Sequence, residues 1–135
     1  MGYAIEKSKQ EWQQILDPNE YQVLREAATE RPWSGVLLDE HREGVFECRA
    51  CGAPLFKSNS KFESGSGWPS FYEPISQDAV ELKVDRAWGM VRTEVLCATC
   101  GSHLGHLFDD APQTPTGDRF CMNSISLQFD PAAND

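Results

Sequence analysis

Apolar residues near the start of the chain recur at helical spacing behind two signals for a helix start. Ser8 and Glu11 have the spacing of a capping box, and an apolar stripe follows at Trp12, Ile15 and Leu16. The pattern restarts at Asp17, a candidate N-cap with Pro18 at the first helical position and Glu20 three residues on. The buried face expected for this second helix consists of Tyr21, Leu24, Ala27 and Ala28. We expect short packing helices within about residues 8–30.

After Arg31, the helical spacing gives way to short apolar runs that end at Gly, Pro, Asn or Asp. The strand candidates are residues 36–38, 44–49, 54–56, 80–84, 90–97 and 118–129. Residues 111–117, which include two prolines, are expected to form the loop before the last strand, and residues 131–135 a tail. Short strands after a helical start favour an α+β fold, mainly β, whose body is made of antiparallel sheets.

The length of the chain predicts one domain of ordinary size, residues 1–135. Its composition, with 40% apolar and 24% charged residues, is typical of a globular protein. The net charge of −9 argues against a nucleic-acid partner, which requires a basic surface. No apolar run reaches the length of a signal peptide in residues 1–20, and none has the length of a membrane span. We therefore expect a cytoplasmic protein without a membrane partner, and in that compartment paired cysteines are more often metal ligands than disulfides.

Four of the five cysteines form two C-x-x-C pairs, Cys48 with Cys51 and Cys97 with Cys100. Each pair follows a predicted strand, and each is followed by a glycine that tolerates the backbone angles of a tight turn. Two such turns supply four thiolates, which fits tetrahedral zinc or iron. Zinc is favoured, because four cysteine ligands leave no open position and nothing indicates electron transfer. The alternative is four free or disulfide-bonded cysteines.

The fifth cysteine, Cys121, has no partner at that spacing and lies in the last predicted strand. Side chains alternate along a strand, so Arg119, Cys121 and Asn123 are expected to share one face. A nearby cation favours the thiolate, which is the reactive form of cysteine. A lone cysteine can also be a small buried hydrophobe. The polar neighbours on its face favour reactivity here.

Two further stretches carry candidate chemistry. In residues 64–71, a Gly/Ser loop ends in Trp68 and Phe71, which form either core anchors or an apolar cage for a ligand. Residues 102–110 hold His103 and His106 directly after the second cysteine pair. These histidines are metal ligands, surface residues or proton donors to a site at Cys121, and histidine titrates in the range that acid–base chemistry needs.

Four motifs together resemble the zinc-containing, B-type methionine-R-sulfoxide reductases. They are C-R-A-C-G, S-G-S-G-W-P-S-F, C-A-T-C-G-S-H-L-G-H-L-F-D-D and R-F-C-M-N, and they occur in the family's order over nearly the whole chain. The resemblance implies two antiparallel β-sheets in a barrel-like sandwich, short N-terminal helices and one structural zinc ion. The zinc ligands it implies are Cys48, Cys51, Cys97 and Cys100.

The resemblance also implies roles for residues around Cys121, which becomes the nucleophile. Trp68, with Phe71 beside it in the motif, then receives the substrate, and His106 is the preferred proton donor. The implied polar shell consists of His103, His106, Asp110, Arg119 and Asn123. The substrate class is methionine-R-sulfoxide in oxidised proteins or peptides, whose repair by this class of enzyme restores methionine.

One position departs from a common pattern of the family. Many relatives carry a second cysteine in the Gly/Ser loop, where this chain has Ser66. Without it, we expect an external thiol from thioredoxin, glutaredoxin or glutathione to reduce the sulfenic acid left on Cys121. Two other function classes remain open at this point: a zinc-ribbon-like binding module without catalysis, and a redox sensor in which oxidation of Cys121 changes the affinity for a partner.

Overall fold

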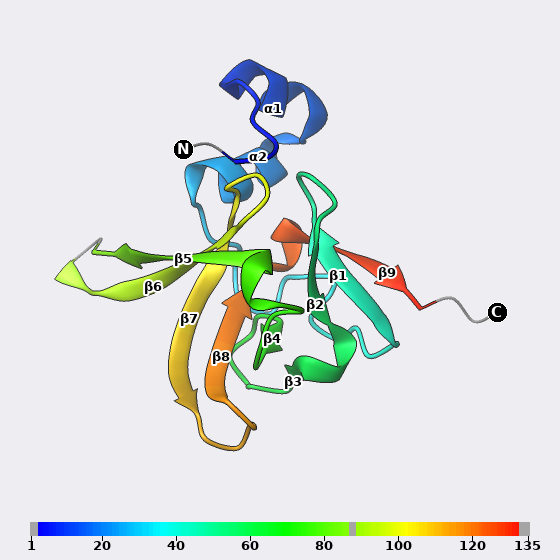
Figure 1. Ribbon diagram of the computed structural model, residues 1–135, viewed down its shortest axis with the longest axis vertical. Helices are drawn as coiled ribbons and strands as arrows, with labels where there is room; N and C mark the ends of the chain where they lie inside the picture. Colours follow the sequence, from blue (N-terminus) through cyan, green and yellow to red (C-terminus); the bar gives the residue numbers. More distant parts are fainter. Residues whose placement is uncertain (1–2, 87–88, 133–135) are drawn as a thin grey trace.

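The computed structural model describes residues 3–86 and 89–132. Helices α1 (Lys9–Ile15) and α2 (Pro18–Glu26) begin at the two predicted capping boxes. The Ser8 hydroxyl accepts the Glu11 N–H, and the Asp17 carboxylate accepts the Glu20 N–H at 2.8 Å. Because each cap satisfies amides that a helix start leaves unpaired, these short helices have defined beginnings. Both helices lie at one end of the molecule (Figure 1).

The body consists of two antiparallel sheets, which confirms the predicted fold class. The smaller sheet has the order β2-β1-β9 and the larger the order β3-β4-β8-β7-β6-β5. The bounds are β1 Gly44–Cys48, β2 Pro54–Lys57, β3 Lys61–Phe62, β4 Ser70–Phe71, β5 Val80–Asp85, β6 Arg92–Cys97, β7 His103–Ala111, β8 Gly117–Met122 and β9 Leu127–Pro131. Strands β7 and β8 run side by side through the centre of the larger sheet (Figure 1).

Aromatic side chains from both sheets form much of the core. Phe56 stacks on Phe71 with ring centroids 4.4 Å apart, and Phe46 meets Phe71 edge-on at 5.0 Å. All three rings are fully buried. The α-helices add Trp12 and Leu24 to the same core. This core fixes the larger sheet against the smaller one and thereby the strands that carry the candidate chemistry.

The predicted strand over residues 118–129 is wrong in extent, because two strands of different sheets share it. β8 ends at Met122, the short 3₁₀ helix η4 (Ser124–Ser126) follows, and β9 then joins the smaller sheet. The predicted strand at 36–38 is also wrong. Its backbone forms turns, and the Leu37 N–H donates to the Ser124 hydroxyl at 2.8 Å.

Smaller differences concern the ends of elements. Ile15 is 55% exposed, so it does not belong to the apolar stripe, and Ala27 is the exposed, left-handed cap of α2 with φ 58°. The expected tail begins inside β9, and residues 133–135 lie outside the described residues. Within the described residues, no helix is long and apolar enough to cross a membrane.

Candidate functional site

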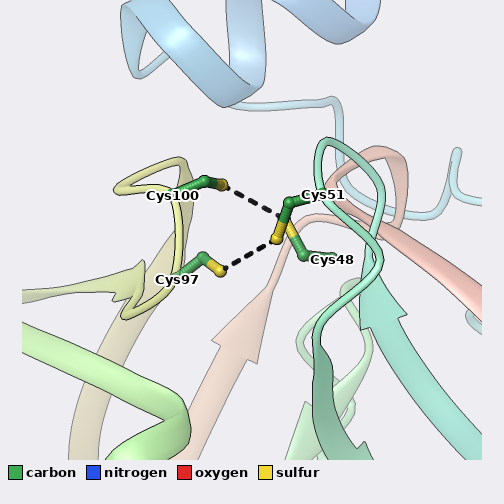
Figure 2. Close-up of side chains that lie close together, drawn as sticks. All are labelled: Cys48, Cys51, Cys97 and Cys100. Carbon is green, nitrogen blue, oxygen red and sulfur yellow. Dashed lines mark hydrogen bonds between the residues drawn. The ribbon is translucent and has the colours of Figure 1, made fainter. Parts of the chain in front are cut away.

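The four paired cysteines meet between the two sheets. Cys48 ends β1 and Cys97 ends β6, while Cys51 and Cys100 lie in the turns that follow (Figure 2). Each turn closes by a 2.7 Å backbone bond, from Gly52 to Cys48 and from Gly101 to Cys97. Both glycines have positive φ, 82° and 78°, which explains the glycine after each pair.

The sulfur positions suit a tetrahedral metal ion. The Cys48 and Cys100 sulfurs are 3.7 Å apart and those of Cys51 and Cys97 are 3.6 Å apart, so neither pair is a disulfide. Zinc–sulfur bonds of about 2.3 Å in a tetrahedron require sulfur–sulfur distances of about 3.8 Å. All four sulfurs lie within 4.8 Å of one another. This set could therefore hold a metal ion, and the ion would join the two sheets.

A cavity of about 220 Å³ opens on the larger sheet next to Cys121. It is lined by Thr29, Ser66, Trp68, Arg92, Gly105, His106, Phe108, Arg119, Cys121 and Asn123. Five residues expected from the sequence therefore share one cavity: Trp68, His106, Arg119, Cys121 and Asn123. His103 and Asp110 are not among the lining residues, but His103 contacts the His106 ring and Asp110 accepts hydrogen bonds from Arg119.

Cys121 lies in β8, with His106 of β7 opposite it in the antiparallel pair. Directly opposite residues carry their side chains on the same face, and both line the cavity. Burial raises the pKa of the Cys121 thiol, while the positive charge of Arg119 and the Ser66 hydroxyl lower it. The Ser66 oxygen lies 3.9 Å from the Cys121 sulfur. A thiol in this setting is shielded from water, and its thiolate depends on nearby positive charge.

Arg119 is held in place on two sides. Its guanidinium donates two hydrogen bonds to the Asp110 carboxylate, both 2.9 Å long, and it stacks on Phe108 at 4.4 Å. These bonds to Arg119 also hold the pKa of the Asp110 carboxyl below its usual value. A paired, stacked guanidinium has few rotamers available, so the cation stays near the thiol.

A β-bulge brings the two histidines together. β7 carries an extra residue between the positions opposite Val95 and Leu96, so His103 and His106 stand with ring centroids 5.4 Å apart. The His106 Nε2 atom lies 2.9 Å from the Asp85 carboxylate, which also accepts from Arg92 at 3.2 Å.

His103 is more deeply buried, at 3% exposure, and its Nδ1 lies 2.7 Å from the Glu94 carboxylate. Burial lowers the pKa of His103 despite that carboxylate. Its Nε2 has no hydrogen-bond partner among the described residues. Of the two histidines, His106 is the one placed to reach a molecule in the cavity.

Trp68 and Asn123 also line the cavity, and both are hydrogen-bonded to Glu30. The Trp68 indole N–H donates to the Glu30 carbonyl at 3.0 Å, and the Asn123 amide bonds Glu30 and Leu104. Phe71 does not line the cavity, because its ring is fully buried in the core. Its position corresponds to the core-anchor interpretation and gives no support to a role in substrate binding.

Several residues at the site were missed by sequence reasoning. They are Thr29, Glu30, Asp85, Arg92, Glu94 and Phe108. Arg92 and Glu94 alternate with apolar residues in a predicted strand, which is a signal for one polar face. The pairing of that face with the histidines depends on sheet order and the bulge, which local pattern does not encode.

Comparisons with known proteins extend over nearly the whole chain. The SelR domain family matches residues 16–131. The chain is 62% identical to the peptide methionine sulfoxide reductase MsrB of Leifsonia xyli subsp. xyli over 96% of this chain and 93% of that protein. It is 56% identical to the protein of the same name from Methanosarcina barkeri, over 93% and 88% of the two chains.

A solved structure shares the fold at low identity. The Mis18 "Yippee-like" domain covers 69% of this chain and 100% of its own, with a TM-score of 0.55 and 19% identity. This likeness concerns the fold alone. The sequence matches, in contrast, span nearly the whole chain and include the cavity and the four-cysteine cluster. The chain therefore belongs to the SelR-domain family, that of the methionine-R-sulfoxide reductases.

Proposed function

We propose that this protein reduces methionine-R-sulfoxide, chiefly in peptides and proteins, to methionine. The observation that carries the proposal is the Cys121–His106 pair, in which a thiol and an imidazole face one cavity beside the Trp68 ring. The relatives' shared name, peptide methionine sulfoxide reductase, supports the same substrate class.

The reaction transfers oxygen from the substrate to Cys121. The thiolate attacks the sulfoxide sulfur and forms a sulfur–sulfur bond, while the oxygen takes up one proton. The resulting hydroxyl group then moves to the Cys121 sulfur as the bonds from the substrate sulfur to Cys121 and to the oxygen break. Methionine leaves as the reduced product, and the Cys121 sulfur becomes a sulfenic acid, oxidised by two electrons. The only group consumed besides the sulfoxide and the thiolate is the proton.

His106 delivers that proton and Arg119 favours the thiolate. Because sulfoxide oxygen is a poor leaving group until it is protonated, a positioned acid contributes roughly a hundredfold or more in rate. The Asp85 carboxylate, 2.9 Å from the His106 Nε2 atom, orients the imidazole. Arg119 opposes the effect of burial on the Cys121 pKa.

Selection of the R epimer requires separate places for the methyl group and the oxygen. Trp68 supplies an apolar wall for the methyl, while the oxygen faces the His106 and Arg119 side. In the S epimer these two groups exchange places, so the oxygen would lie against the indole and lose its donor.

Recycling uses an external thiol, because Ser66 stands where a second cysteine would act. Two thiol groups, from glutathione, glutaredoxin or thioredoxin, reduce the sulfenic acid, yielding the Cys121 thiol, a disulfide and water. The remaining four cysteines form the four-cysteine cluster and are best explained as ligands of one structural zinc ion. Thiol reductants and reduced zinc ligands both suit the cytoplasm.

The deciding experiment is a reductase assay with dithiothreitol on separated R and S epimers of a methionine sulfoxide peptide. We expect turnover of the R epimer only. Absence of turnover on both would favour the zinc-ribbon-like binding module. A single stoichiometric oxidation of Cys121 without further turnover, even with reductant present, would favour the redox sensor.

A further inference from the structure

Every polar group of Glu30 forms a hydrogen bond to Trp68, to Asn123 or to the residues that follow Asn123. Its backbone carbonyl accepts the Trp68 indole N–H at 3.0 Å, and its backbone N–H donates to the Asn123 side-chain oxygen at 3.0 Å. Its carboxylate accepts the N–H groups of Ser124 and Ile125, both at 2.9 Å. One residue thus connects two cavity-lining side chains to the start of η4.

The connection bridges distant parts of the chain. Glu30 lies in the segment after α2, and Ser124 follows Cys121 by three positions. The two segments pack closely, since a Cβ on Gly35 would come within 2.7 Å of the Glu30 carboxylate and would also meet Ser124. Burial raises the pKa of the Glu30 carboxyl, and the two N–H donors act in the opposite direction. A half-buried carboxylate with two amide donors is a rigid anchor.

We propose that Glu30 is a positioning residue that sets the width of the pocket for the sulfur substituent. The Glu30 carboxylate holds the segment after α2 against Ser124 and Ile125. The Glu30 backbone, fixed in this way, holds the Trp68 ring and the Asn123 amide. The inference rests on the proposed function, because it takes Trp68 as the wall that receives the methyl group. Glu30 does not line the cavity, so it acts through these two residues and not on the substrate.

The replacement Glu30→Gln tests this, because it keeps the size of the side chain but turns one acceptor into a donor. Either Ser124 or Ile125 then faces an NH₂ group with its own N–H, and the anchor loosens. We expect kcat/KM for the methionine-R-sulfoxide peptide to fall roughly tenfold or more, since small shifts of positioning groups carry large rate costs.

Pocket width is measured with a second substrate, the ethionine-R-sulfoxide peptide, whose sulfur carries an ethyl group. One methylene is discriminated by about tenfold or more in a well-fitted pocket. Glu30→Gln should reduce the methyl-over-ethyl preference by about threefold or more, because the wall can move. Mere destabilisation would lower both rates by the same factor and leave the preference unchanged.

Two further variants make the test specific. Glu20→Gln removes a carboxylate that accepts the Asp17 N–H at the start of α2, outside the residues that line the cavity, and should preserve the preference. In a Trp68→Phe background, which lacks the indole N–H, Glu30→Gln should have little additional effect on the preference. If Glu30→Gln does not fold, Glu30→Asp replaces it, because it keeps both oxygens but withdraws them from the two amides.

The outcomes separate the two proposals. If the wild type is active and Glu30→Gln keeps the wild-type methyl-over-ethyl preference, the positioning role of Glu30 is overturned. The proposed reductase function is unaffected by that result. A wild-type protein without reductase activity would overturn both. A smaller preference in Glu30→Gln, normal in Glu20→Gln, is the result that supports the positioning role.

Discussion

His106 stands directly opposite Cys121 across the antiparallel pair of β7 and β8, and both side chains face the same cavity. The pairing places an imidazole and a thiol on two central strands of the larger sheet, each of which is hydrogen-bonded to a strand on both sides. Held in this way, the proposed nucleophile and the proposed acid need little reorganisation during reaction.

The acid role of His106 predicts a defect in the chemical step. In His106→Asn, we expect the single-turnover rate to fall about a hundredfold while KM changes by less than about threefold. The control is His41→Asn, which alters an exposed histidine that lies 3.9 Å from Glu63 and outside the cavity lining. A normal single-turnover rate in His106→Asn would mean that His103 or water, and not His106, delivers the proton.

Arg119 predicts how the reactivity of Cys121 depends on pH. Only the thiolate reacts with iodoacetamide, so alkylation accelerates as the pH rises through the pKa of Cys121. Because Arg119 lowers that pKa, Arg119→Gln should move the midpoint of the pH profile upward and slow alkylation at neutral pH. Peptide mapping restricts the measurement to Cys121.

A second arginine in the chain provides a matched control. Arg42 also forms two hydrogen bonds to one carboxylate, that of Glu40, and also lies over a phenylalanine ring, Phe129. It does not line the cavity, so Arg42→Gln should leave the profile unchanged. A midpoint that stays in place in Arg119→Gln would mean that Arg119 does not stabilise the thiolate.

The four-cysteine cluster predicts one zinc ion per chain and a role in folding. Cys48→Ser should lose the metal and lower Tm by more than about 10 °C, because the proposed ion would join the two sheets. Elemental analysis and calorimetry provide the measurements. Cys121→Ser should keep both the zinc and the Tm, and metal-free protein with a normal Tm would contradict the structural role.

Replacing Ser66 with cysteine should allow a disulfide to form with the oxidised Cys121. The Ser66 oxygen lies 3.9 Å from the Cys121 sulfur, so a thiol in its place is within reach of the sulfenic acid. After one equivalent of sulfoxide and no reductant, mass spectrometry of Ser66→Cys should find a disulfide between the introduced thiol and Cys121. An oxidised variant in which the introduced thiol stays free would show that the loop holds this side chain out of reach.

Local patterns predicted the helices, most of the strands and the four-cysteine cluster, because caps, alternation and C-x-x-C spacing are properties of neighbouring residues. They failed where tertiary structure decides. The strand predicted over 118–129 is two strands, since the chain leaves the larger sheet at Met122 and enters the smaller one at Leu127. The turns at 36–38 depend on Ser124, a partner far away in sequence.

The same limit applies to the candidate site. Alternation along β8 correctly placed Arg119 and Cys121 on one face. The Gly/Ser loop and the paired histidines marked Trp68 and His106 as candidates, and the family resemblance chose among their alternative roles. Strand β7 was not predicted at all, and its bulge determines that both histidines stand on one side. The carboxylates that hold them come from β5 and β6, and strand order is a property of the whole fold.

The most direct test of the account is a count of product in the absence of reductant. Protein is mixed with excess methionine-R-sulfoxide peptide and a dimedone-type reagent, and methionine, zinc and the modified cysteine are measured by mass spectrometry. We predict one methionine per chain, the adduct on Cys121, zinc retained, and no product from Cys121→Ser. An equal yield from Cys121→Ser would contradict the role of Cys121 as the nucleophile. A disulfide between Cys121 and a cysteine of the four-cysteine cluster would contradict recycling by an external thiol.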